Sequence, residues 1–232
     1  MRKELLLFAL LSSWAPAATA AGAQANSDPP ASPLSQRGDA PHAIDGIAAR
    51  IEDDILTESE VRELRSFQGF VDGQAKSRAE LLRELEDQWI VRGEATAAFY
   101  PEPSEEDVNR AYSQLQKQFP SADEFVRRSG AAGLSKATVR RLLAQQLYLS
   151  RFLDFRFRPA AQITEAQIEE YYKNEFSAPL QKRGQAVPAL DDVEDTIREV
   201  LIQRAISDRA TAWLDDTRGR LQIDVVAPEA KD

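Results

Sequence analysis

Few side chains in this sequence could carry out acid-base, nucleophilic or metal chemistry. The only histidine is His42, which lies in a proline-rich stretch, and the chain contains no cysteine. The rest of the chain therefore lacks the side chains for a histidine triad, a thiolate nucleophile or a Cys/His metal site. Adjacent acids could act as an acid-base pair, but at helix starts such pairs more often favour the helix dipole or solvate a face. The pairs are Asp53-Asp54, Glu105-Glu106, Glu169-Glu170 and Asp215-Asp216.

Aromatic side chains are the better candidates for a binding function. A dense group of them lies on both sides of Pro159. Such a group could fill the core, or it could line an exposed groove that takes up extended or unfolded polypeptide by apolar contact. Trp89 and Trp213 lie on apolar helical faces, and we expect both in the core. The candidate polypeptide-binding residues are Tyr148, Phe152, Phe155, Phe157, Tyr171, Tyr172 and Phe176.

The charge of the chain argues against nucleic acid as a partner. The formal net charge is −9, whereas binding to phosphates needs a basic face. The basic pairs Arg127-Arg128 and Arg140-Arg141 are interpreted as solvated helix faces in ion pairs. The sequence has no glycine-rich phosphate loop, and we expect no cofactor, no bound metal and no catalytic residue.

The stretch that the rest of the chain must cover is residues 134–158, which is long, apolar and free of glycine and proline. Its leucine, valine and phenylalanine side chains recur at i, i+3 and i+4, which predicts an amphipathic helix. Ser135 is suited to cap the start, and Pro159 disfavours helical geometry at the residue before it. Tyr148 and Phe155 fall on the opposite side, so this helix needs apolar neighbours on more than one flank.

A recurring cap marks the start of further helices. A Ser or Thr followed three residues later by an acid or amide satisfies the free N–H groups of a first helical turn. This pattern occurs at Thr57, Ser77, Ser104, Ser121 and Thr164. The predicted helices cover residues 57–67, 77–98, 104–118, 121–129, 164–175 and, without such a cap, 190–218.

Two short strands are expected at the ends of the folded body. Apolar residues alternate with polar ones at residues 47–51 and again at 221–225. A lone strand cannot satisfy its backbone, so we expect these two to pair. Residues 177–189 are predicted to be a polar connector. The expected fold class is mainly α, with a multi-helix core and a small two-stranded sheet that joins the N-terminal and C-terminal strands.

The first residues follow the pattern of a secretory signal. Arg2 and Lys3 precede an apolar run at residues 5–11, and a small-x-small sequence ends at Ala20. This predicts a signal peptide over residues 1–20, cleaved near Ala20. A membrane anchor is the alternative, but serines and a proline interrupt the run, which is shorter than the roughly 20 residues that a span needs.

The remaining chain divides into three parts. Residues 21–43 are rich in Ala, Pro, Ser, Gln and Gly and are expected to form a disordered leader. Residues 44–226 are expected to form the folded body, and residues 227–232 a tail. We expect a Gram-negative periplasmic location without stable membrane insertion after cleavage, with full secretion left open.

The order of these parts resembles the chaperone core of the SurA-like periplasmic chaperones and the related parvulin-type (PpiC-like) exported isomerases. The resemblance covers about residues 44–226. It lies in the opening IAARIEDDILTESEVREL, the middle SADEFVRRSGAAGLSKATVRRLLAQQLYLSRF, the helix ITEAQIEEYYKNEF and the closing IREVLIQRAISDRATAWLDDTRGRLQIDV.

The resemblance implies a helical chaperone body, and one departure limits what it carries over. In isomerase relatives a parvulin domain follows the ITEAQIEEYY helix, but here residues 177–189 fall far short of the roughly 50 residues of a small domain. We therefore expect an ATP-independent holdase for unfolded exported or outer-membrane proteins, and no enzyme. The alternatives are a dedicated accessory module of envelope or secretion assembly, which could be a homodimer, and, less favoured, a prolyl isomerase.

Overall fold

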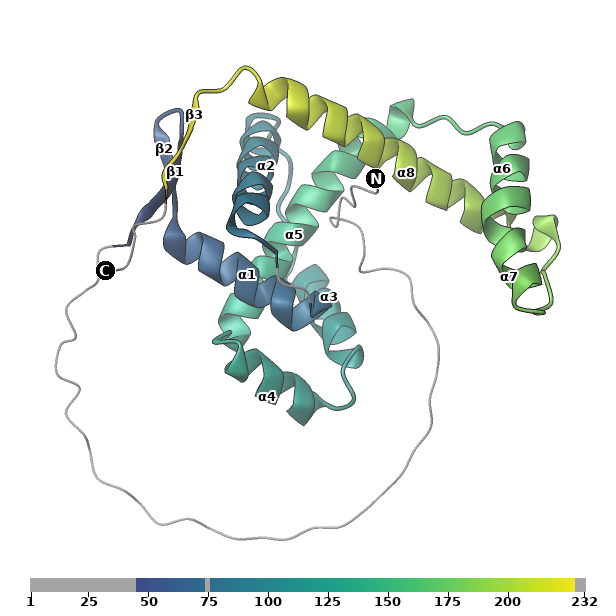
Figure 1. The fold of residues 1–232 in the computed structure, drawn as a ribbon, viewed down its shortest axis with the longest axis horizontal. Helices are drawn as coiled ribbons and strands as arrows, with labels where there is room; N and C mark the ends of the chain where they lie inside the picture. Colours follow the sequence, from purple (N-terminus) through teal and green to yellow (C-terminus); the bar gives the residue numbers. More distant parts are fainter. Residues whose placement is uncertain (1–44, 74–75, 228–232) are drawn as a thin grey trace, which may run out of the picture. The chain divides into compact units, whose positions relative to one another are not determined.

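In a computed structural model of the chain, residues 45–73 and 76–227 are described. The predicted signal peptide, the leader with His42, and the tail beyond Ala227 lie outside the described residues. The chain divides into Met1–Asp45 and Gly46–Asp232. Every helix and strand of the described residues belongs to the second unit, which is drawn in colour in Figure 1.

The second unit is mainly helical, as predicted, and its predicted helices are present. α5 (Lys136–Phe157) is the long apolar helix, and it contacts α2, α3 and α8. It therefore has neighbours on several flanks, as the distribution of its apolar side chains requires (Figure 1). The helices are α1 (Glu58–Asp72), α2 (Arg78–Ala97), α3 (Glu105–Lys117), α4 (Ala122–Ala131), α5, α6 (Glu165–Tyr171), α7 (Ala178–Lys182) and α8 (Leu190–Arg218), with a 3-10 turn at Arg158–Ala160.

The predicted caps set the starts of these helices. Thr57, Ser77, Ser104 and Thr164 each form a complete capping box with the residue three positions on. Ser121 accepts only the backbone N–H of Glu124, at 3.1 Å. The Glu124 carboxylate instead accepts from Arg127 and Arg128, so the reciprocal half of that box is missing.

The first helix runs further than predicted. α1 continues to Asp72 instead of ending near residue 67. Its end is set by Gly73, which has φ 66° and donates its N–H to Gly69 O at 3.1 Å. A glycine in the left-handed region is the usual way to end a helix.

The sheet pairs the two ends of the body, and it has one strand more than expected. β1 (Ile47–Ile51) lies between β2 (Asp54–Thr57) and β3 (Ile223–Val225), antiparallel to both. The predicted pairing is confirmed, with Ile51 opposite Ile223 and Ala49 opposite Val225. β2 adds a third strand to the predicted pair, since Glu52 takes φ 51° and the chain turns back there into β2.

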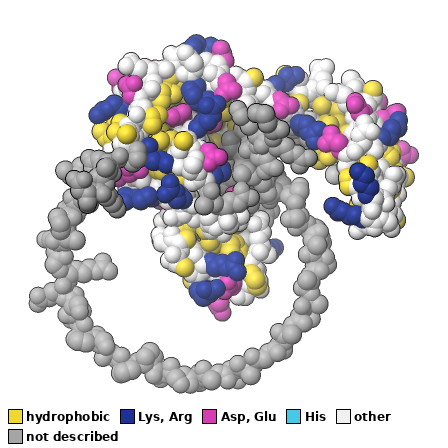
Figure 2. Space-filling model, viewed as in Figure 1, with side chains coloured by type: hydrophobic (Ala, Val, Ile, Leu, Met, Phe, Trp, Pro, Cys, Tyr) yellow, Lys and Arg dark blue, Asp and Glu magenta, His cyan; other side chains and the backbone are white. Residues whose placement is uncertain are grey.

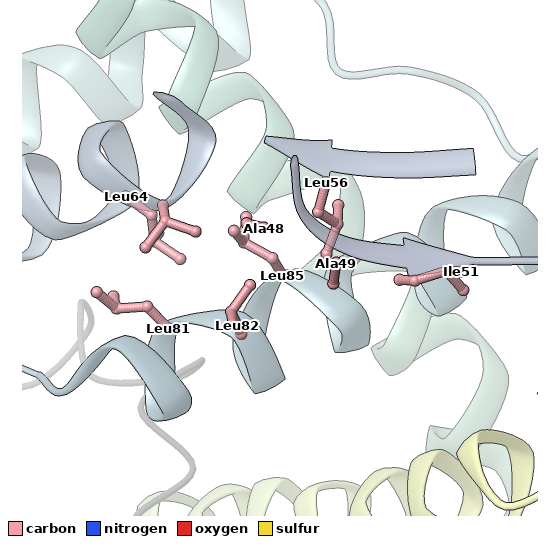
Figure 3. Close-up of a cluster of buried hydrophobic side chains, with 9 residues drawn as sticks. Ala48, Ala49, Ile51, Leu56, Leu64, Leu81, Leu82 and Leu85 are labelled. Carbon is pink, nitrogen blue, oxygen red and sulfur yellow. The ribbon is translucent and has the colours of Figure 1, made fainter. Parts of the chain in front are cut away.

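Apolar side chains form three neighbouring core clusters. One cluster lies between β1, β2, α1 and α2 (Figure 3). A second joins α2, α5 and α8, and a third joins α1, α3, α4 and α5. Trp89 packs against the first two clusters and Trp213 against the second, and both are half-buried. The first cluster is Ala48, Ala49, Ile51, Leu56, Val61, Leu64, Leu81, Leu82 and Leu85.

The predicted connector begins with helix. After α6 the chain widens into a π-helical turn at Tyr172–Ser177 and continues as α7 to Lys182. Pro179 lies in the first turn of α7, where a missing N–H is tolerated. The prediction that helix ends before residue 177 was therefore wrong, and only residues 183–189 are non-helical. α6 packs on the N-terminal part of α8 through buried Ile168 and Ile197.

Within residues 45–73 and 76–227, none of the helices combines the length and the apolar character that crossing a membrane demands.

Candidate functional site

The structure divides the predicted aromatic residues among three places. Tyr148, Phe152 and Phe155 surround Tyr100, with ring centroids 5.9, 5.6 and 5.3 Å from it. Phe157 instead packs on Trp213 at 5.8 Å. The residues predicted at 171, 172 and 176 lie on α6 and the π-helical turn, and they do not share ring contacts with the α5 group among the described residues.

The α5 residues differ in exposure. Phe152 is a core residue with 1% of its surface exposed. Tyr148 is half-buried and donates its hydroxyl to Tyr100 O at 3.3 Å. Phe155 is 63% exposed. Of these three rings, only Phe155 offers most of its surface to another molecule.

The aromatic residues beyond Pro159 hold their own segment together. Tyr172 stacks on Phe176 at 5.9 Å and donates its hydroxyl to Pro188 O at 2.8 Å. The Arg204 guanidinium lies 5.3 Å from the Tyr171 ring centre. All three rings are half-buried. Their contacts account for them as packing residues of the α6–α8 region.

Among the residues that the structure describes, the most exposed aromatic ring is one that the sequence did not point to. Phe99 follows the end of α2, has φ 52° and is 94% exposed. Its N–H donates to Thr96 O at 3.0 Å, and the N–H of Tyr100 donates to Ala95 O at 2.9 Å. This position after a helix normally takes glycine, because a side chain there is strained. An exposed ring in a strained backbone suggests a role outside folding.

Phe99, Tyr100 and Phe155 together form what we call the aromatic patch. Tyr100 follows Phe99 directly in the chain, and its ring centroid lies 5.3 Å from that of Phe155. Tyr100 also contacts the buried Phe152, with ring centroids 5.6 Å apart. The patch therefore lies where the end of α2 meets α5. The sequence pattern that could have indicated it is the Phe-Tyr pair between the end of a predicted helix and Pro101.

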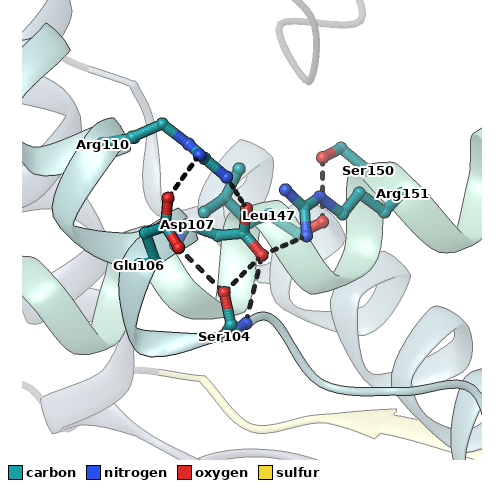
Figure 4. Close-up of polar contacts among 7 residues, drawn as sticks. All are labelled: Ser104, Glu106, Asp107, Arg110, Leu147, Ser150 and Arg151. Atoms are coloured by element: carbon teal, nitrogen blue, oxygen red, sulfur yellow. Dashed lines mark hydrogen bonds and ion pairs between the residues drawn. The ribbon is translucent and has the colours of Figure 1, made fainter.

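Ion pairs fix the elements around the patch. Arg151 on α5 donates to Asp107 on α3 at 2.8 Å, and Asp107 also accepts from Arg110 and from the Ser104 hydroxyl (Figure 4). These donors, Arg151 first, hold the pKa of Asp107 well below its usual range. Arg156 pairs with Glu94 at 3.2 Å. The charged groups named here are occupied, and they position α3 and α5.

The acid pairs and basic pairs behave as the sequence reasoning expected of solvated faces. At least one member of each pair lies in an ion pair or hydrogen bond, on a helix in every case except Asp54, which lies on β2. The contacts are Glu105 with Arg140, Glu106 with Arg110, Glu169 with Lys173, Asp215 with Arg83, Asp216 with Arg220, Asp54 with Trp89 Nε1, Glu124 with Arg127 and Arg128, and Glu63 with Arg141. In the part of the chain that the structure describes, no group of three or more His, Cys, Asp or Glu side chains is placed to hold a metal ion.

One charged cluster is mostly buried and links α2 to α8. The Arg218 guanidinium contacts Asp87, lies 3.2 Å from Glu86 and lies 3.0 Å from Asp215. Burial raises the pKa of Asp87 to about 6, although Arg218 opposes the shift. Burial also raises the pKa of Glu86. The cluster holds the two helices together at a cost in desolvation.

The raised pKa of Asp87 predicts a pH-dependent gain for the variant Asp87→Asn. In the unfolded chain the group titrates near 3.8, and in the folded chain near about 6. The ionised form is therefore penalised in the folded protein above pH 6, and the penalty disappears as the pH falls through 6 to 4. We expect the free energy of unfolding of Asp87→Asn, relative to that of wild type, to increase by up to about 3 kcal/mol as the pH rises from 4 to 7. Urea unfolding at both pH values measures this, and a constant difference would contradict it.

Strain at Phe99 predicts that Phe99→Gly makes the protein more stable. Glycine adopts φ near +50° without the steric penalty that a side chain pays. Since the ring is almost fully exposed, little packing is lost. We expect the free energy of unfolding to rise by about 1 kcal/mol. Thermal and urea unfolding would show this, whereas Phe99→Ala, which keeps the strain, serves as the control and should change stability little.

No family model matches the chain, and a search of curated proteins gives no match.

Proposed function

We propose that this protein is an ATP-independent periplasmic chaperone that holds unfolded exported or outer-membrane proteins through its aromatic patch. The observation that carries the proposal is Phe99, which is 94% exposed in a left-handed backbone and precedes Tyr100, whose ring contacts that of exposed Phe155. The resemblance of residues 44–226 to SurA-like chaperone cores supports it, as does the signal-like pattern of residues 1–20.

Apolar contact alone is enough for this function. An aromatic side chain can bury 150–250 Å², so covering the rings of Phe99 and Phe155 contributes at most about 12 kcal/mol at roughly 25 cal/mol per Å². Ordering the client and losing its free motion offset most of this gain. Binding should therefore be weak and reversible, as a holdase that releases its clients without ATP requires.

The test is suppression of aggregation by the purified protein. A denatured client that aggregates on dilution is followed by light scattering with a several-fold excess of the wild type. We expect wild type to delay aggregation, and the double variant Phe99→Gly/Phe155→Ser to delay it much less. Ile55→Ser is the matched control, because Ile55 is an exposed apolar residue on β2, outside the patch.

Several outcomes would separate the proposal from its alternatives. No delay of aggregation by wild type would contradict it, and so would equal activity of the double variant. Binding to a single co-purifying partner, with no effect on unrelated clients, would favour a dedicated accessory module. Turnover in a proline-peptide isomerisation assay would overturn the expectation that the protein is not an enzyme.

A further inference from the structure

A surface depression lined by both apolar and polar residues lies away from the residues of the aromatic patch. It opens between the C-terminal part of α1, the connection from α3 to α4, and the end of α4. We call it the α1/α4 groove. In Figure 2, apolar side chains are visible among basic and acidic ones at the lower end of the coloured unit, over α4. The residues that line the groove include Gly69, Phe70, Asp72, Phe119, Pro120 and Arg128.

The apolar wall of the groove is rigid. Phe119 stacks on Phe70 with ring centroids 4.9 Å apart. Both rings also contact Phe125, at 5.1 and 5.2 Å, and Phe125 is fully buried. Phe119 itself is half-buried, and the Arg128 guanidinium lies 5.8 Å from its ring centre, so only the rest of the ring is exposed to the groove. A fixed aromatic wall costs little ordering when a ligand packs on it.

One of the residues that line the groove is a glycine inside the helical run of α1. Gly69 lies in α1 with its surface exposed, and a Cβ placed on it would meet nothing within 4 Å. Glycine weakens a helix interior relative to alanine, and here packing does not require it. Because Gly69 lines the groove, a large side chain at this position would extend into it.

One carboxylate at the groove has no partner of its own. Among the described residues, no hydrogen bond or ion pair reaches the carboxylate of Asp72, an exposed residue; partial burial raises its pKa, and the nearby charge of Lys76 opposes the shift. The nearby Lys76 donates to Glu84 at 2.8 Å. On the other side Arg128 is held by Glu124 at 2.5 Å. A cation brought into the groove would therefore compensate Asp72 without breaking an existing pair.

We propose that the α1/α4 groove binds a polypeptide segment in which a large apolar side chain is next to a lysine or arginine. The apolar side chain packs on Phe119 above Gly69, and the cation pairs with Asp72. This inference rests on the proposed function only in taking an unfolded polypeptide as the occupant. It adds a charge preference that the aromatic patch does not supply.

Fluorescence anisotropy with two labelled peptides tests the groove directly. Both are ten-residue Gly/Ser peptides, one with a central Phe-Lys pair and the other with Phe-Glu. We expect wild type to bind the Phe-Lys peptide more tightly, by about threefold to tenfold. Asp72→Asn should remove that preference while leaving a weak common affinity.

A variant with a large side chain in the groove tests the proposal more strongly than removal of the charge. Gly69→Leu should weaken binding of the Phe-Lys peptide by about tenfold or more, because the leucine takes the space that the apolar side chain needs. Gly93→Leu is the matched control, since Gly93 also lies inside a helix, is exposed and has open space around it. Both variants should remain folded by circular dichroism, because leucine favours helix over glycine.

The outcomes separate this inference from the proposed function. Unchanged peptide affinity in Gly69→Leu, or equal affinity of wild type for the two peptides, would overturn the groove proposal. If wild type still delays aggregation and the Phe99→Gly/Phe155→Ser variant does not, the chaperone proposal stands and only the groove proposal fails. If wild type neither binds peptide nor delays aggregation, both fail.

Discussion

Replacing Phe125 by alanine should cost about 3–5 kcal/mol of the free energy of unfolding, the range for a large buried aromatic side chain. Phe125 is 1% exposed, and its ring contacts those of Phe70, Tyr112 and Phe119 at 5.2, 5.3 and 5.1 Å. These partners lie on α1, on α3 and in the connection to α4. The alanine would leave a cavity where the three segments meet.

Chemical denaturation of the variant and wild type measures this loss. The neighbouring Val126→Ala is the control, because Val126 is 60% exposed on the same helix. Its replacement should change stability by less than about 0.5 kcal/mol. Similar effects at positions 125 and 126 would contradict the packing of α4 described above.

The second large effect is expected at Arg218. The variant Arg218→Ala removes the cation that faces Glu86 and Asp87. These carboxylates are mostly buried, with 8% and 18% of their side-chain surface exposed. Breaking such a pair from one side leaves uncompensated charge, which typically costs about 3–5 kcal/mol. We expect a loss in this range near pH 7.

The pH dependence of that loss identifies its cause. Burial already raises the pKa values of both acids, and the loss of Arg218 should raise them further. The acids then become neutral at low pH, so the variant should recover much of its stability near pH 5. Arg220→Ala is the control, since Arg220 and its partner Asp216 are 65% and 66% exposed, and it should change stability by less than about 1 kcal/mol. A loss at Arg218 that is the same at pH 5 and pH 7 would point to packing instead of charge.

Much of the helical framework could be predicted because its signals are local. A capping residue and its partner three positions on lie in the same turn, so their pattern survives whatever packs around them. The apolar repeat of α5 likewise showed that it needs several neighbours. The pairing of β1 with β3 followed from a simple requirement, since a single strand cannot satisfy its backbone hydrogen bonds.

The structure differs from the predictions where local signals are not enough. Glu52 is not a usual turn residue, yet it takes φ 51° because its N–H donates to Gln222 O and its side chain accepts from Gln222 N, at 3.0 and 2.8 Å. Gln222, the partner in both contacts, is 170 positions further along the chain than Glu52. Pro179 looked like a helix breaker, but a proline in a first helical turn breaks nothing.

The candidate site was only partly predictable. Periodicity can place Phe152 and Phe155 on different sides of α5, but whether a given side faces water depends on the neighbouring helices. Tyr100 reaches that face from the end of α2, 48 residues from its hydrogen-bond partner Tyr148. Phe99 was missed because a left-handed phenylalanine cannot be recognised from residue types alone.

Site-specific photo-crosslinking to an unfolded client tests most directly whether the aromatic patch holds polypeptides. A photoreactive phenylalanine analogue is placed at position 99, at position 155 and, as an exposed control, at position 55. We expect client crosslinks from positions 99 and 155, competed away by unlabelled client, and few from position 55. Equal crosslinking from all three positions, or none from 99 and 155, would contradict the assignment of the aromatic patch as the surface that holds polypeptides.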